Sequence, residues 1–256
     1  PRMDESIGII KRLLTESNPI TYKSDWFTLN EALLHLRPYT QPHFPIAVAA
    51  AQSPSGMVAA GKHGLGVLSV SVVRGGSISS NLGDFWAIAE ETAESYGQTV
   101  DRKEWRIVLH VHLAESRKEA MEQVRERSAA YQYDYFHQTM GMPFEYDGPR
   151  EKIADYMVAN GAWCVGTPDD LIAKIKELDV QSGGFGGFMI QATEWGTREQ
   201  VMHSYELIAR YVMPHFQGSL TNLQISQKWS EEHREELQSL KTVSIDKAIS
   251  DYRETK

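Results

Sequence analysis

The sequence has few of the features that mark secreted, membrane or nucleic-acid-binding proteins. Its 256 residues include one cysteine, Cys164, so no internal disulfide can form and nothing indicates an oxidising compartment. No apolar run approaches the roughly 20 residues that a membrane-spanning helix needs, and no signal peptide is evident. The net charge of −8 argues against a broad phosphate-binding surface for nucleic acid. These absences predict a cytoplasmic protein.

The chain also lacks an initiator methionine at position 1. It opens on Pro1, and Met3, Ile7, Ile10 and Leu14 then follow at helical spacing on one face. A chain that begins inside an amphipathic helix is expected to be a fragment or a processed product, with Met3 as an alternative start.

Helical and strand-like segments alternate, which is typical of parallel βα units. Four apolar stretches predict buried strands, at 46–50, 66–71, 105–113 and 188–191. Ser116 and Thr167 have the pattern of residues that cap the start of a helix, whereas 18–44 and 139–163 are expected to be irregular. Four parallel strands can form a small open sheet or half of an eight-stranded barrel, and the leading helix without a strand before it favours the half barrel.

The strongest local candidate for a binding site is the loop after the first predicted strand. Gln52, Ser53, Ser55, Gly56 and Met57 lie in it, between a buried strand and a helix. Free N–H groups and the helix dipole favour a phosphate at such a turn. The two hydroxyls add donors, and the glycine allows close approach to the backbone. The alternative is an ordinary serine helix cap without a ligand.

The third predicted strand carries two histidines on one face. Its apolar residues, such as Ile107 and Leu109, alternate with His110 and His112, so the apolar face is expected to meet helices and the histidine face to point into the barrel. His112 lies toward the end of the strand where barrel enzymes keep their chemistry, so it is the candidate for flavin or substrate contact or acid–base catalysis. The alternative is a buried histidine satisfied by a neighbouring group. Two histidines without a third ligand are a weak metal signal, and no metal is predicted.

Two loops flank the last predicted strand. The run at 183–187 contains four glycines and is expected to enter the strand at the bottom of the barrel, because it does not follow a strand as a dinucleotide-binding loop does. After the strand, Glu194 and Trp195 are candidates to line a substrate pocket, with a surface loop and a packed tryptophan as the alternative. Cys164 is expected to be a small buried residue. The segment from 219 to 256 is charge-dense and predicts a solvated tail, or else an arm that binds a partner.

Several stretches in this order resemble the bacterial luciferase-like flavin-dependent monooxygenases, most of all the limonene monooxygenase type. They are RMDE at 2–5 and KRLL at 11–14, YKSDWF at 22–27 and LRPY at 36–39, QPHFPI at 41–46 and SPSGMVAA at 53–60, and GTPDDL at 166–171 with GGFGG at 183–187. The resemblance covers about 2–218. It implies a (β/α)₈ TIM barrel of the luciferase-like type, with this chain supplying about strands 5–8 and their helices.

The resemblance also implies a chemistry. Members of the family bind reduced FMN at the C-terminal mouth of the strands and use O₂ to oxygenate an organic substrate, here expected to be small and apolar. Ser53 matches a phosphate-contacting serine, whereas Gln52 stands where bacterial luciferase has an acidic residue. The reduced flavin comes from a separate flavin reductase, and the complete enzyme is expected to be a homodimer.

Part of the site would lie outside this chain. In the family, much of the flavin ring pocket and an active-site histidine come from the first four strands, so residues 1–256 alone are not expected to turn over. One alternative is a deazaflavin-dependent oxidoreductase on the same fold, which transfers hydride and ignores O₂. The other is an inactive half barrel that serves as a flavin-binding or assembly module through its open sheet edge.

Overall fold

The computed structural model describes residues 2–51, 53–70 and 82–254. Its contacts divide the chain into two compact units, Pro1–Ser204 and Tyr205–Lys256. The main elements follow one another as α1 (Arg2–Thr15), β1 (Ile20–Lys23), β2 (Thr28–Ala32), β3 (Ala47–Ala50), α2 (Ser55–His63), β4 (Gly66–Ser69), α3 (Leu82–Ser95), β5 (Trp105–Leu113), α4 (Arg117–Ala129), η2 (Ala130–Thr139), α5 (Ile153–Ala159), β6 (Trp163–Gly166), α6 (Pro168–Ser182), β7 (Gly187–Gln191), α7 (Arg198–Leu207), η4 (Ile208–Val212), α8 (Met213–Phe216), α9 (Thr221–Glu232) and α10 (Arg234–Glu254).

A parallel sheet of five strands organises the first unit within the described residues. β3 pairs with β4, and β4 pairs with the start of β5. Both β4 and β7 pair with Arg106 and Ile107, so these two strands lie on opposite edges of β5. Both β6 and β7 pair with His110, so β6 follows β4 along the same edge. The sheet is open rather than a closed barrel over the part of the chain that the structure describes.

The four predicted strands are confirmed as β3, β4, β5 and β7, and the expectation of only four parallel strands was wrong. β6 is the additional one. Its four residues are all buried, so they show no alternation, and the strand runs directly into the helix cap at Thr167. A short apolar run of this kind cannot be distinguished by its period from the core of a helix or a loop.

The two segments expected to be irregular contain regular structure. The segment 18–44 holds an antiparallel hairpin, β1 with β2, whose turn is fixed by the Ser24 hydroxyl, which accepts the N–H groups of Trp26 and Phe27. The segment 139–163 holds α5. The helix predicted from Ser116 does begin there, but after Ala129 it continues as the π-helix η2. β1 alternates over only four residues and β2 is mostly exposed without a regular period, which is why the pattern missed them.

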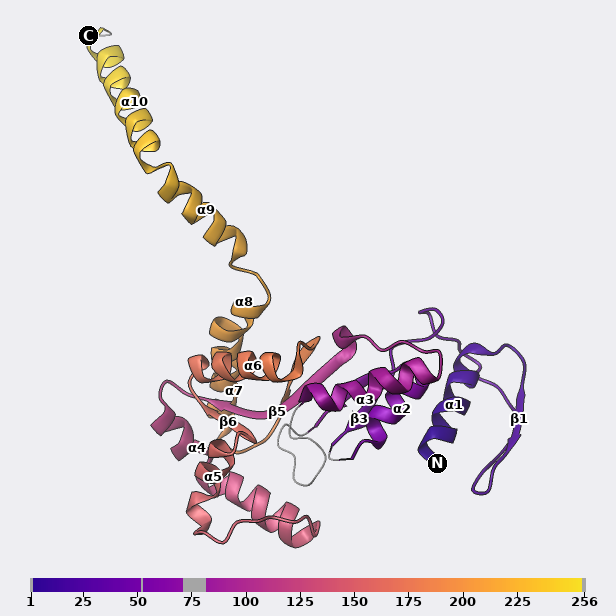
Figure 1. Ribbon diagram of the computed structural model, residues 1–256. Helices are drawn as coiled ribbons and strands as arrows, with labels where there is room; N and C mark the ends of the chain where they lie inside the picture. Colours follow the sequence, from indigo (N-terminus) through magenta and orange to yellow (C-terminus); the bar gives the residue numbers. More distant parts are fainter. Residues whose placement is uncertain (1, 52, 71–81, 255–256) are drawn as a thin grey trace. The chain divides into compact units, whose positions relative to one another are not determined.

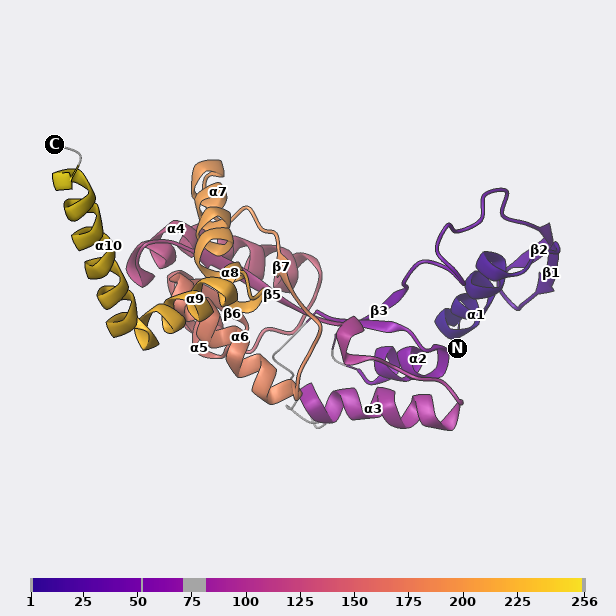
Figure 2. The same cartoon turned by 90° about the horizontal axis from the view of Figure 1, so that it is seen from above.

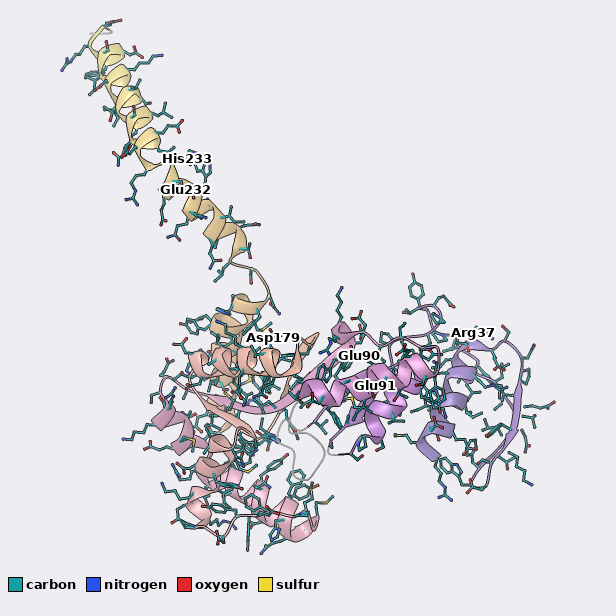
Figure 3. The ribbon with its side chains drawn as sticks, in the orientation of Figure 1. Arg37, Glu90, Glu91, Asp179, Glu232 and His233 are labelled. Atoms are coloured by element: carbon teal, nitrogen blue, oxygen red, sulfur yellow. The ribbon has the colours of Figure 1, made fainter. Side chains whose placement is uncertain are left out.

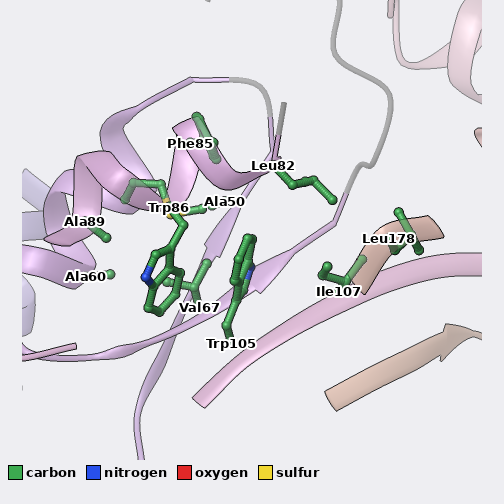
Figure 4. Packing of buried hydrophobic residues seen from close by; sticks show 11 residues of the cluster. Ala50, Ala60, Val67, Leu82, Phe85, Trp86, Ala89, Trp105, Ile107 and Leu178 are labelled. Carbon is green, nitrogen blue, oxygen red and sulfur yellow. The ribbon is translucent and has the colours of Figure 1, made fainter. Parts of the chain in front are cut away.

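The main core lies between the sheet and the helices α2, α3 and α6. The helices α2 and α3 pack side by side next to β3 (Figures 1 and 2). Figure 4 shows the buried cluster, which consists of Ala50, Met57, Ala60, Val67, Leu82, Phe85, Trp86, Ala89, Trp105, Ile107 and Leu178. Because Ile107 belongs to this cluster, the apolar face of β5 meets helices as predicted.

A second core joins α4 and α5 to β6. It includes Val124 of α4, Ile153 of α5, Trp163 and Val165 of β6, and Trp195 from the loop after β7. This core therefore buries the side chains of the additional strand β6. The histidine side of β5 is in contact with the same region, through side-chain hydrogen bonds that reach α4 and η2.

The second unit ends in α9 and α10, neither of which has a buried residue. The break between them falls at Glu232 and His233, where the His233 ring stacks on Trp229 at 4.4 Å between centroids (Figure 3). Among the helices of the described residues, none combines the length and the apolar content needed to cross a membrane.

Candidate functional site

The loop between β3 and α2 places two serine hydroxyls at the start of a helix. Ser53 Oγ and Ser55 Oγ lie 2.6 Å apart and both residues are exposed. Pro54 precedes the first turn of α2 and offers no side-chain cap. Within the described residues, the first backbone hydrogen bond of α2 runs from the Val58 N–H to the Pro54 carbonyl. The start of α2 thus presents the Ser53 and Ser55 hydroxyls at the surface, above the backbone N–H groups of its first turn.

These donors fit a phosphate group. Backbone N–H groups at a helix start and adjacent hydroxyls are the neutral donors that bind phosphate at helix N-termini. The expected role of Gly56 is less direct, because a side chain there would meet Ala50 Cβ at 2.8 Å and the Ala49 carbonyl at 2.9 Å. Its missing side chain lets α2 approach β3. Met57 is fully buried in the main core, so only its backbone can face a ligand. Gln52 lies outside the described residues.

A second group of candidate residues lies on the histidine face of the sheet. Trp163 of β6, His110 of β5 and Gln191 of β7 are direct neighbours across three strands, so their side chains share one face. The row begins at Trp163, the first residue of β6, passes His110 in the second half of β5, and ends at Gln191, the last residue of β7, at the carboxyl end of that strand. Parallel sheets of barrel enzymes carry their chemistry at that end.

Tyr131 of η2 connects this row by hydrogen bonds. Its hydroxyl lies 3.1 Å from His110 Nε2 and accepts a hydrogen bond from Gln191 Nε2 at 3.2 Å. The His110 ring also stacks on Trp195, with centroids 5.2 Å apart and planes 5° from parallel. Burial lowers the pKa of His110 from 6.5 to about 4, so the ring is neutral near pH 7. A neutral imidazole has one nitrogen that accepts, and Tyr131 can donate to it.

His112 is more deeply buried, with 3% of its surface exposed. Its Nε2 lies 2.8 Å from Gln123 Oε1, and Gln123 in turn donates to Glu119 at 3.0 Å. With its amide nitrogen donating to Glu119, Gln123 presents its oxygen to His112, so His112 Nε2 carries the proton. Burial lowers the pKa of His112, and the hydrogen bond to Gln123 opposes that shift. Nε2 is the one ring nitrogen of His112 with a hydrogen-bond partner among the described residues.

The two candidate substrate contacts after β7 differ in exposure. Glu194 is exposed, and its carbonyl accepts a hydrogen bond from Arg127 at 3.4 Å. Trp195 is 2% exposed and lies against both His110 and Trp163. Its indole Nε1 has no hydrogen-bond partner among the described residues. Trp195 is therefore a buried packing partner of the His110 ring in this structure.

The sequence pattern missed Tyr131, Trp163 and Gln191. Nothing in the local sequence ties these residues to His110, since Tyr131 is 21 residues away and Gln191 is 81 residues away from it. A signal was available in Gln191, because it stands at the end of an apolar strand where polar residues line barrel mouths. Tyr131 had no such signal, because its position depends on the π-helical turn.

The remaining predicted features have structural roles. Cys164 is buried, and burial raises the pKa of its thiol to about 12, which makes it unreactive. The loop at 183–187 enters β7 at its amino end, as expected. Among the described residues, no three His, Cys, Asp or Glu side chains come together as a possible metal site.

The family model for luciferase-like monooxygenases matches residues 1–185. The chain belongs to the luciferase-like monooxygenase family. Within it, the chain is 35% identical over 229 residues to 4-hydroxyprotoasukamycin monooxygenase of Streptomyces nodosus subsp. asukaensis, an alignment that covers 89% of this chain and 62% of that relative. It is 37% identical over 220 residues to limonene 1,2-monooxygenase of Rhodococcus erythropolis, covering 86% of this chain and 55% of the relative.

Solved structures of this luciferase-like family share the fold. The oxygenating constituent of 3,6-diketocamphane monooxygenase from Pseudomonas putida, solved with FMN, has a TM-score of 0.62 at 22% identity and aligns with 82% of this chain and 62% of its own. An F420-dependent secondary alcohol dehydrogenase has a TM-score of 0.56 at 18% identity and aligns with 81% of this chain and 59% of its own. This chain spans less than two thirds of the length of these proteins.

Proposed function

We propose that the complete protein is a flavin-dependent monooxygenase that uses reduced FMN and O₂ to oxygenate a small apolar organic molecule. The observation that carries this proposal is the pair of serine hydroxyls, 2.6 Å apart, at the uncapped start of α2 in a chain of the luciferase-like family. FMN has a terminal phosphate, and this is the arrangement of neutral donors that a phosphate needs.

The residues of this chain would share the work between two places. Ser53, Ser55 and the backbone N–H groups of Gly56 and Met57 would hold the phosphate, with Gln52 next to them in the sequence. When bound, the reduced flavin supplies the electrons that activate O₂. The histidine face of β5, with His112 as the candidate acid–base residue, and the loop after β7, with Glu194 and Trp195, would hold and orient the substrate.

A deazaflavin-dependent oxidoreductase is the second candidate. One structural relative of this fold is F420-dependent, and a deazaflavin such as F420 also presents a phosphate. The two functions differ in their need for oxygen, because a deazaflavin transfers hydride. The complete protein is further expected to act as a homodimer and to receive its reduced flavin from a reductase.

The test uses the complete protein, anaerobic titration with reduced FMN, and limonene as an apolar probe substrate. Tight binding of reduced FMN and transfer of one oxygen atom from labelled O₂ to limonene or a related apolar probe are expected. The double variant Ser53→Ala/Ser55→Ala should bind reduced FMN at least about 10-fold more weakly, since hydrogen bonds to a charged group are worth roughly 1.5–3 kcal/mol each.

Ser116→Ala is the matched control, because Ser116 also starts a helix and accepts the Glu119 N–H at 3.2 Å, but it lies on α4. Unchanged FMN affinity in this variant is expected. If the double variant binds reduced FMN as tightly as the parent, the phosphate site is elsewhere. If the protein binds F420 but not FMN, the monooxygenase assignment gives way to the oxidoreductase.

A further inference from the structure

Tyr131, His110 and Gln191 form a hydrogen-bonded group in which the bond between Tyr131 and His110 can run in either direction. Gln191 donates to the Tyr131 oxygen, which leaves Tyr131 with one hydroxyl proton to place. Among the described residues, the acceptor within reach of that proton is His110 Nε2, at 3.1 Å. Alternatively, His110 donates from Nε2 to the Tyr131 oxygen, and the hydroxyl proton is then free for a third group.

This choice makes Tyr131 an adjustable donor. In one arrangement Tyr131 donates to His110, which carries its proton on Nδ1. In the other, the Tyr131 hydroxyl keeps its proton and donates a hydrogen bond to a ligand oxygen, while His110 is the tautomer that carries its proton on Nε2 and donates a hydrogen bond to the Tyr131 oxygen. Both arrangements keep the imidazole neutral and keep the Tyr131 oxygen within its capacity of two accepted hydrogen bonds.

The surroundings select the kind of ligand. His110, Tyr131 and Gln191 each keep part of their surface exposed. The rings in contact with His110 and Tyr131 are those of Trp163, Trp195, Phe136 and Tyr135, which are all uncharged. Neutral donors in an aromatic setting favour an uncharged acceptor such as a carbonyl over a carboxylate, which costs much more free energy to remove from water.

Two further observations support a ligand at this place. Tyr131 is carried by the ten-residue π-helix η2, and π-helical turns are rare and frequently found at functional sites. Trp195, stacked on His110, has a buried indole Nε1 with no partner among the described residues, which is a second donor in need of an acceptor.

We propose that Tyr131 is a specificity-determining residue that donates its hydroxyl proton to a carbonyl oxygen of the substrate, while His110 changes from acceptor to donor to hold Tyr131 in place. The proposal rests on the proposed function, because it names the substrate group that this same site recognises. According to this proposal, the substrate is an apolar molecule that carries one carbonyl oxygen, and this oxygen binds next to the Tyr131 hydroxyl.

The test compares two probes of nearly the same shape, acetophenone and α-methylstyrene, in which a C=CH₂ group replaces the C=O. The complete protein is labelled with ¹⁵N-histidine, and the His110 signals are identified by their loss in His110→Gln. Acetophenone is expected to move the His110 Nε2 signal from the acceptor type to the protonated type, and α-methylstyrene is expected to leave it unchanged. In Tyr131→Phe, the change should vanish and acetophenone should bind roughly 3- to 10-fold more weakly.

Tyr133→Phe is the matched control, because it removes the same atom from the same helix at a residue that faces His137 and Arg150. It should behave like the parent protein. An unchanged His110 signal at the solubility limit of acetophenone overturns the proposal, and so does parental affinity in Tyr131→Phe. A loss of FMN affinity in Tyr131→Phe as large as the loss for acetophenone would assign the hydroxyl to the flavin and also overturn it. Because the measurements with acetophenone and α-methylstyrene need no flavin, they can succeed or fail independently of reduced FMN binding, which tests the proposed function.

Discussion

The two ends of β5 have the same alternating sequence pattern but differ in how their polar groups are hydrogen-bonded. At the amino end, Trp105 is fully buried, stacks on Trp86 at 4.7 Å and donates to Ser69 Oγ at 2.9 Å (Figure 4). Arg102 lies over both indoles, at 5.5 and 5.8 Å, and donates to the Ser182 carbonyl at 2.5 Å. Trp86 donates to Glu90 of α3 at 2.7 Å, at the rim of this cluster (Figure 3). Each of these donors has a defined acceptor, and Arg102 has three, the carbonyls of Ser182 and Gly184 and the carboxylate of Glu90.

At the carboxyl end, the hydrogen bonds have more than one possible arrangement. His110 is half-buried and neutral, its bond with Tyr131 can run in either direction, and the neighbouring Trp195 Nε1 has no partner among the described residues. A single strand therefore has a stabilising end and an adaptable end, which is the division of labour seen in parallel barrels. Because Trp105 and His110 also lie on opposite faces of β5, stability and chemistry are separated both along the strand and between its faces.

The largest expected effect concerns the stabilising end. Trp105→Ala removes a fully buried indole, its stack on Trp86 and its hydrogen bond to Ser69, and should lower the free energy of unfolding by about 3–5 kcal/mol. Urea denaturation measures this. Trp229→Ala on α9 is the control, because Trp229 is 52% exposed and its loss should cost little. Equal costs in the two variants would show that the amino end of β5 is not where stability is concentrated.

The adaptable end should contribute a pH dependence. Burial lowers the pKa of His110 from 6.5 to about 4, so between these pH values the unfolded chain binds a proton that the folded protein does not. The free energy of unfolding should therefore fall as the pH falls from 6.5 to 4, by at most about 1.4 kcal/mol per pH unit and about 3 kcal/mol in total. His112, whose pKa burial also lowers, acts in the same direction.

Urea denaturation at several pH values, with His110→Gln beside the parent, tests this. The variant should lose part of the slope between pH 4 and 6.5, whereas replacing the exposed His35 with Gln should preserve it. A slope that is the same in His110→Gln and the parent would mean that His110 takes up a proton as readily in the folded protein as in the unfolded chain.

The smallest expected effect concerns His112. Gln123→Leu leaves the buried Nε2 of His112 without a partner and should cost about 1–2 kcal/mol. Gln181→Leu is the control, because Gln181 makes the same kind of bond to a glutamate four residues earlier, Glu177, on an exposed helix surface. A thermal melt that ranks Gln181→Leu as the more costly change would contradict the role of Gln123 as the partner of His112.

Local sequence patterns predicted the elements whose structure depends on residues close together in the chain. The alternation along β5 identified both of its faces, and the residues at Ser116 and Thr167 identified the starts of α4 and α6, where each hydroxyl accepts a backbone N–H of the first turn. The loop after β3 was also evident, because serines between an apolar strand and a helix form a local signal. Of that loop, Gly56 was interpreted as an approach for an anion, and the structure gives it a packing reason instead.

The sequence by itself determined the succession of βα units, the helix starts and the presence of two histidines on one face of a buried strand, because each depends on residues only a few positions apart. The tertiary structure alone decided what those histidines touch. Trp163 and Gln191 reach His110 through strand pairing, Tyr131 reaches it through a π-helical turn, and Trp195 stacks on it from a loop. Contacts across such separations have no period in the sequence, since they arise only when the strands have found their register and the second core has closed around β6.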